Sequence, residues 1–299
     1  ILEAGEGVKG PPMKGGLRLE DLGDRFIVHH SAGLRFGVMK NLAGFLAEGR
    51  TPRLDYVASG SPGLWFQTKD GPKHYLGGTK TGAPIVQAGA MATRFFFTGP
   101  IAPEDPAVGH WDAEMCFPSS KSWVEFTLNF DEGRTAVTAL GLDLDLVQHK
   151  PPVLVDLGAG TLVYSALKPG QEIRLRAGYM PRINSAPTWQ VDLKNSGIWE
   201  PFVIPGNSGG GRNAEGWAHV MDNVACTAIA IANFDEGEAT ELRIDSHAKI
   251  RLQRRVPNPK KNLHFWLHFV EMPVQVGAVT SPQAMLAPLL VRVELIPNK

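Results

Sequence analysis

Three ionisable side chains recur at every second position over residues 110–114, where they could exchange protons with a bound molecule. They are His110, Asp112 and Glu114. Alternate residues of a β-strand face the same side, so all three would share one face and Trp111 would take the other. A histidine beside carboxylates suits general acid–base catalysis, because each charge shifts the pKa of its neighbour. Asp112 and Glu114 are also candidates for a cation site, with calcium left open and a solvent-facing polar strand as the alternative.

His74 and Tyr75 follow a predicted hairpin turn within residues 63–78, where a Lys-Asp-Gly-Pro sequence is a strong turn signal. A histidine and a tyrosine at a sheet edge are candidates for the base and the acid of a β-elimination. The amphipathic end of a hairpin is the alternative.

Two further catalytic candidates lie in the second half of the chain. Arg212 ends the glycine-rich segment 206–212 and could neutralise a substrate carboxylate. His219 lies two residues after Trp217, so both side chains would share one strand face. A surface loop without a role and a packed histidine are the alternatives.

A stripe of polar and aromatic residues alternates with apolar ones over residues 264–269. One face would be apolar and the other would carry His-Trp-His, which is typical of a glycan groove. The outer two histidines are about 13 Å apart on a strand, so they would not share a metal ion. A tryptophan after a Ser-Gly turn at residues 196–197 offers a second stacking platform if it is exposed. The substrate-binding candidates are therefore Trp199, Glu200, His264, Trp266 and His268.

Composition limits the class of protein and of partner. Lysine plus arginine equals aspartate plus glutamate at 30 each, which favours neither nucleic acid nor an anionic membrane as a partner. No apolar run approaches the roughly 18 residues that a membrane span needs. Hydrophobic residues make up 43% of 299, enough for a sizeable core. The two cysteines, Cys116 and Cys226, form no CxxC motif; we expect buried free thiols, with a single disulfide as the alternative.

Short strands separated by glycine and proline turns fill the sequence, which contains 33 glycines and 23 prolines. Helical signals are limited to residues 40–48 and 281–286, and the last predicted strand covers residues 287–296. Roughly sixteen or more strands predict an all-β fold, a large antiparallel β-sandwich of two sheets packed face to face. Residues 1–16 are expected to be an N-terminal extension and residues 17–299 a single sandwich domain.

Residues 216–255 resemble part of a known carbohydrate-active family. They carry a Gly-Trp-Ala opening at 216–218, an Asp-Asn turn at 222–223, an apolar strand ending in Asn-Phe-Asp at 233–235, and Leu-Arg-Ile-Asp at 242–245. This pattern resembles the central β-sandwich of the exo-rhamnogalacturonan lyase and YetA-like family. Residues 86–89, 122–125 and 261–267 resemble further strands of that family. In the last of these the family's histidine falls on Leu263 and its glutamate on His264.

The resemblance implies a supersandwich fold of the galactose-mutarotase-like kind and a function. Family members are longer and carry an α/α toroid, for which this sequence shows no counterpart. The implied function is that of a polysaccharide lyase cleaving a uronic-acid-containing plant or algal polysaccharide by β-elimination. An acidic polysaccharide or oligosaccharide would be the partner, and the protein would be extracellular or periplasmic. A non-catalytic carbohydrate-binding sandwich and an aldose-epimerase-like isomerase are the alternatives.

Overall fold

The computed structural model describes residues 16–30, 33–69, 71–78, 82–89, 91–102, 109–132, 137–159, 162–178, 189–203, 214–235, 239–255 and 262–272. Their regular structure consists of 21 strands and one short 3₁₀ helix, Leu76–Gly78. All strand pairs within the sheets are antiparallel. The predicted all-β class is thereby confirmed.

The strands form three sheets. The nine-stranded sheet runs, in spatial order, β13 (Leu162–Leu167), β12 (Val153–Gly158), β17 (Trp217–Met221), β18 (Ala225–Ile231), β21 (Asn262–Glu271), β10 (Trp123–Glu132), β9 (Gly109–Pro118), β8 (Ala92–Pro100) and β7 (Ile85–Ala88). The eight-stranded sheet runs β16 (Ile198–Val203), β15 (Trp189–Asn195), β14 (Glu172–Ala177), β19 (Thr240–Asp245), β20 (Lys249–Arg255), β11 (Val137–Asp145), β5 (Gly63–Thr68) and β6 (Lys73–Tyr75). The four-stranded sheet runs β1 (Arg18–Asp21), β2 (Arg25–His29), β3 (Arg35–Met39) and β4 (Glu48–Arg50).

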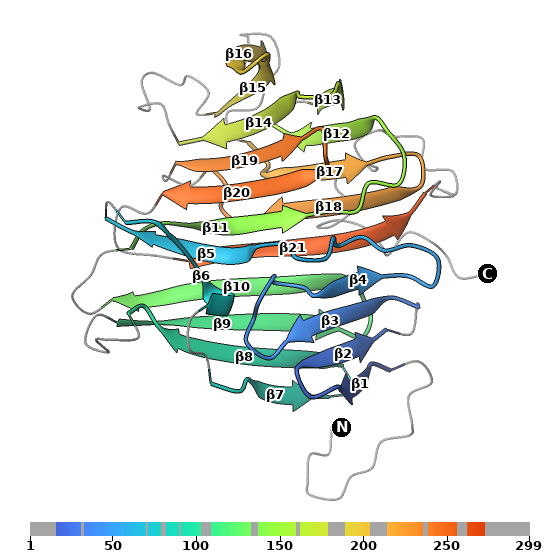
Figure 1. The fold of residues 1–299 in the computed structure, drawn as a ribbon, viewed down its shortest axis with the longest axis vertical. Coiled ribbons are helices and arrows are strands. Elements are labelled where there is room, and N and C mark those ends of the chain that lie inside the picture. The colour runs from blue at the N-terminus through green and yellow to red at the C-terminus, as the bar shows by residue number, and fades with distance from the viewer. Residues whose placement is uncertain are drawn as a thin grey trace, which may run out of the picture.

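The nine-stranded sheet is the backbone of the sandwich. It extends along the long axis of the molecule, and the eight-stranded sheet covers its upper part while the four-stranded sheet covers its lower part (Figure 1). Both covering sheets lie on the same face, because one continuous cluster of buried side chains includes residues of all three sheets. The predicted large antiparallel sandwich is confirmed, with one of its two layers divided between two sheets.

Aromatic side chains hold the layers together. Phe45 packs against Phe126 and Phe265 with ring centroids 5.2 and 5.3 Å apart, and Phe36 of the four-stranded sheet lies 5.1 Å from Phe117. All five rings are almost completely buried. Fully burying one such side chain contributes about 1.5–3 kcal/mol of hydrophobic stabilisation.

The one or two helical turns considered for residues 40–48 do not form. This segment consists of turns, and Leu42 and Phe45 take left-handed backbone angles with φ of 59° and 65°. Leu42, Phe45 and Leu46 are buried in the core between the sheets. A helix of nine residues is marginal by itself, so the burial of these three side chains decides the backbone conformation.

Two other sequence predictions also have outcomes here. Cys116 and Cys226 are both free and buried, which confirms the prediction of free thiols. No helix in the described part of the chain is long and apolar enough to cross a membrane. The predicted helix at 281–286, the strand at 287–296 and most of the extension at 1–16 lie outside the described residues, and the boundary of a single domain at 17–299 stays a prediction.

Gly141 shows how closely side chains pack even on the outer face of the eight-stranded sheet. The indole of Trp65, on the neighbouring strand β5, lies across it. A methyl group on Gly141 would overlap the Leu252 carbonyl oxygen and come within 2.6 Å of the Trp65 ring.

We therefore expect Gly141→Ala to lower the free energy of unfolding by about 1–3 kcal/mol, the usual cost of overpacking. Gly82→Ala is the matched control, because a methyl group there meets no atom within 4 Å. Urea denaturation of both variants measures the difference. Equal stability of the two variants would contradict the packing described for Trp65.

Candidate functional site

The outer face of the nine-stranded sheet, called the open face below, carries the residues that could act on a ligand. The two covering sheets occupy the other face, and no described element lies over this one. Side chains on neighbouring antiparallel strands stand directly opposite one another, so the strand register arranges them in rows across the sheet.

One row runs from β12 to β10 and contains two histidines. Asp156 pairs with His219, His219 with Ala228, Ala228 with His268, and His268 with Trp123. His219 Nδ1 lies 3.6 Å from Asp156 Oδ2, and both side chains are largely buried. The row thus places a histidine–carboxylate pair and a second histidine on either side of one alanine.

The next row contains two tryptophans on either side of another alanine. Trp217 pairs with Ala230, Ala230 with Trp266, and Trp266 with Glu125. Trp217, Ala230 and Trp266 belong to an apolar cluster separate from the main core, because the small alanine leaves room for the indoles on either side of it. Trp266 remains half-buried and accessible, whereas Trp217 is only 6% exposed.

His264 and Glu125 form the more accessible histidine–carboxylate pair. His264 Nε2 and Glu125 Oε1 are 2.8 Å apart, and the side chains are 31% and 37% exposed. The His264 ring lies 4.3 Å from the Trp266 ring. A proton donor, a proton acceptor and an indole surface therefore meet at one place on the open face.

His268 is buried at the edge of this group. Its Nε2 lies 2.5 Å from Ser122 Oγ, and its buried Nδ1 has no hydrogen-bond partner among the described residues. Burial is the main cause that lowers the pKa of His268 to about 4, and the neighbouring His219 side chain adds to the shift. His268 is therefore neutral near pH 7 and accepts or donates hydrogen bonds without carrying charge.

The predicted triplet on β9 lies on the same face but forms no metal site. His110, Asp112 and Glu114 share the open face, as the spacing indicated, and Trp111 is buried on the other side. His110 Nε2 lies 3.2 Å from Asp112, whereas Glu114 turns to Arg94 at 3.4 Å. No group of three His, Cys, Asp or Glu side chains in the described ranges is placed to hold a metal ion. The cation site suggested for Asp112 and Glu114 is not formed, because their side chains turn to different partners.

His74 and Tyr75 do not form an acid–base pair. They are neighbours on strand β6, so their side chains point to opposite faces. His74 stacks on Phe66 with ring centroids 5.2 Å apart, whereas the Tyr75 hydroxyl donates to Asp143 at 2.7 Å. Burial and this hydrogen bond raise the pKa of Tyr75 to about 12. The prediction that both serve one reaction is corrected.

Trp199 and Glu200 lie on the opposite side of the sandwich from Trp266. Both belong to β16, the edge strand of the eight-stranded sheet. The Arg174 guanidinium covers the Trp199 ring at 4.1 Å, and Lys194 lies 5.6 Å from its centroid. The two predicted stacking platforms, Trp199 and Trp266, therefore lie on different sheets. Arg212 lies outside the described residues.

The structure adds three residues to the site that the sequence prediction missed: Trp123, Glu125 and Asp156. Trp123 and Glu125 alternate with buried Val124 and Phe126 on β10, so their shared face was readable from the two-residue period. Their proximity to the β21 stripe depends on strand pairing, which the sequence does not show.

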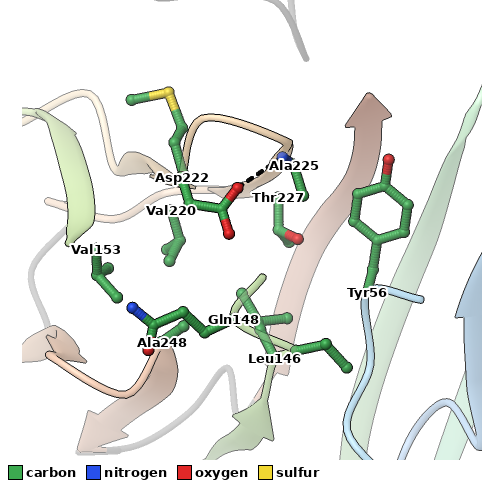
Figure 2. Close-up of a pocket in the computed structure, with 11 residues that line it drawn as sticks. Tyr56, Leu146, Gln148, Val153, Val220, Asp222, Ala225, Thr227 and Ala248 are labelled. Carbon is green, nitrogen blue, oxygen red and sulfur yellow. Dashed lines mark hydrogen bonds between the residues drawn. The ribbon is translucent and has the colours of Figure 1, made fainter. Parts of the chain in front are cut away.

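Asp222, near His219 in the sequence, has a structural role instead. Its carboxylate accepts hydrogen bonds from the backbone N–H groups of His149, Lys150, Val224 and Ala225, which hold its pKa below the ordinary value although burial opposes this. Figure 2 shows it at a cavity between the sheets, near Tyr56 and Gln148. The cavity measures about 10 Å³, which is space for about one water molecule and not for a sugar.

Comparison with known proteins identifies the fold but no family. No model of a known protein family matches the sequence, and no significant match was found among curated proteins. The resemblance to the exo-rhamnogalacturonan lyase family therefore stays a prediction.

Solved structures match in fold. The α-N-acetylgalactosaminidase NagBb from Bifidobacterium bifidum, in complex with GalNAc, aligns with a TM-score of 0.52 and 8% identity over 81% of this chain. This chain spans 35% of that enzyme's length. A galactose mutarotase-like protein from Lactobacillus casei ATCC 334 aligns with a TM-score of 0.42 and 12% identity over 85% of this chain and 100% of its own. An α-mannosidase from Enterococcus faecalis V583 aligns with a TM-score of 0.45 and 8% identity over 87% of this chain and 30% of its own.

The buried His268 predicts a specific dependence of stability on pH. Its folded pKa of about 4 lies below the ordinary value of 6.5, so the unfolded chain binds more protons between these pH values. This contribution to stability is complete above pH 6.5 and is lost as the pH falls towards 4.

Between pH 6.5 and pH 4, we expect the free energy of unfolding of the natural chain to fall by up to about 3 kcal/mol more than that of His268→Gln. Denaturant unfolding at several pH values in this range measures the slope of the free energy of unfolding against pH. His74→Gln, at an exposed position, is the control substitution. A slope unaffected by His268→Gln would show that this histidine is not buried neutral.

Proposed function

We propose that this protein recognises carbohydrate on the open face, around Trp266. The proposal rests on one observation: the half-buried indoles of Trp123 and Trp266 stand in adjoining rows beside the accessible His264–Glu125 pair. An indole stacks on the apolar face of a sugar ring, while an imidazole and a carboxylate take hydrogen bonds from its hydroxyl groups. The likeness in fold to an α-N-acetylgalactosaminidase supports a carbohydrate-related role.

An aldose-epimerase-like reaction is the activity that the His264–Glu125 pair favours. Such a reaction requires one group that removes the proton of the anomeric hydroxyl and another that protonates the ring oxygen. The ring opens, the carbonyl rotates, and the two groups reverse their roles when the ring closes on the other face. His264 and Glu125 provide a donor and an acceptor at 2.8 Å beside a stacking surface.

Polysaccharide cleavage by β-elimination remains a prediction. A lyase needs a cation beside the uronate carboxylate, and Arg212, proposed for that role, lies outside the described residues. A non-catalytic binding sandwich is the other alternative, and location outside the cytoplasm stays an expectation. Incubation with uronate polysaccharides separates these possibilities, since elimination produces an unsaturated uronate that absorbs ultraviolet light and binding alone does not.

Exchanging one tryptophan on each side of the sandwich tests the location of the site. We expect Trp266→Ala to weaken saccharide binding at least tenfold, about 1.4 kcal/mol, because the stacking surface is lost. Trp199→Ala, on the far side, should leave affinity unchanged. Isothermal titration with a panel of neutral, amino and acidic oligosaccharides provides the affinities. A loss in Trp199→Ala alone would place the site on the eight-stranded sheet.

Exchanging the ionisable pair tests the isomerase reaction. We expect Glu125→Gln and His264→Gln each to slow the interconversion of anomers by about 10²–10⁴-fold, the usual contribution of an acid–base group. Sugar affinity should change much less, because the amide still forms hydrogen bonds. Proton NMR of freshly dissolved α-anomers follows the rate. A natural chain that binds sugar without accelerating the interconversion would support the non-catalytic binding alternative.

A further inference from the structure

The charges of the open face indicate which sugars it takes, and this inference rests on the proposed function. We infer that the open face selects neutral and amino sugars and disfavours uronates. The sequence-based expectation of an acidic polysaccharide partner points in the opposite direction, so the two are directly comparable by experiment.

Carboxylates outnumber cations on the described part of the open face. Six carboxylates lie on it or at its rim: Asp112, Glu114, Glu125, Asp131, Asp156 and Glu215. Two cationic side chains accompany them, Arg94 and Lys121. Since His268 is neutral near pH 7, it adds no compensating charge.

Arg94 and Lys121 can compensate at most two of the six carboxylate charges, while His110, His219 and His264, which lie beside four of the carboxylates, add positive charge only when protonated. Arg94 is paired with Glu114 at 3.4 Å, and the Lys121 ammonium lies 5.4 Å from the Trp123 ring centre. Among the described residues, the ion pairs of Asp112 and Asp131 are both with His110, and the two aspartate side chains are 56% and 77% exposed. Their charges therefore reach the solvent in front of the sheet.

The stacking surface lies within this negative field. A sugar on Trp266 would be next to Glu125, whose position is directly opposite on β10. A carboxylate at C6 of that sugar would meet a like charge within a few ångströms, whereas a protonated amino group would meet an opposite one. Charges at this distance are only partly screened at physiological ionic strength, where the Debye length is about 8 Å.

The outer face of the eight-stranded sheet differs in this respect and offers an internal comparison. Arginine and lysine side chains there cover buried carboxylates, as Arg174 and Arg176 cover Asp192 at 2.8 and 2.9 Å. Cations therefore form the solvent-facing part of that surface, whereas carboxylates form it on the open face. The charge preference is thus a property of the open face and not of the chain as a whole, whose formal net charge is +0.

Oligosaccharides in which each charged sugar differs from the neutral one in a single substituent test this inference. The first series is β-1,4-linked glucose, glucosamine and glucuronate tetramers; the second is the corresponding galactose, galactosamine and galacturonate tetramers. We expect titration at low salt to give affinities in the order amino, neutral, uronate, with at least tenfold between the first and the last. The difference should shrink in 0.5 M sodium chloride.

The double variant Asp112→Asn with Asp131→Asn should reduce the difference in affinity between the amino sugar and the uronate, because it removes two exposed charges outside the stacking surface. Asp145→Asn, on the eight-stranded sheet, is the control and should leave this difference in affinity unchanged. Uronate binding equal to or tighter than neutral binding, and lost in Trp266→Ala, would overturn the inference while leaving the proposed function intact. Absence of binding by all six oligosaccharides would instead count against the proposed function.

Discussion

Burial of one face of the nine-stranded sheet is the constraint on which the rest of this structure depends. The aromatic rings on that face, such as Phe126 and Phe265, pack 5.3 Å apart under the covering sheets. Because side chains alternate with a period of two, fixing these rings inward fixes their neighbours outward. A slip of one residue in β21 would move Phe265 to solvent and Trp266 into the core. The hydrophobic core thus determines which side chains the open face presents.

Small residues on β18 shape the middle of the open face. Ala228 and Ala230 occupy positions between strands that carry histidine and tryptophan, and both alanines are almost fully buried by these neighbours. Larger side chains at these positions would hold the indoles of Trp217 and Trp266 apart. Glycine has a similar effect nearby, since a methyl group on Gly158 would overlap the Trp217 indole. The small side chains of β18 and the close approach of the Trp217 indole to the Gly158 backbone together create the apolar surface beside the ionisable groups.

The other outer face illustrates a structural use of the same residue types. Asp143 is 5% exposed and accepts hydrogen bonds from Trp65, Tyr75 and Lys73. Removing a partner from such a group leaves a buried charge unpaired, which is strongly destabilising. Tyr75 is thus explained by the stability of the sheet, and a catalytic role is not needed to account for it.

The sequence alone determined which residues of each strand share a face, and the tertiary structure decided which strands lie side by side. Alternation was sufficient to predict strands and to place His264, Trp266 and His268 on one face, because a strand's period is independent of its partners. It could not show that β10 pairs with β21, which brings Glu125 to His264 from 139 positions away. Nor could it separate Trp199 from Trp266, since assignment of a strand to one sheet or the other depends on long-range pairing. For the same reason the segment 40–48 took its conformation from the core it fills and not from its own helical tendency.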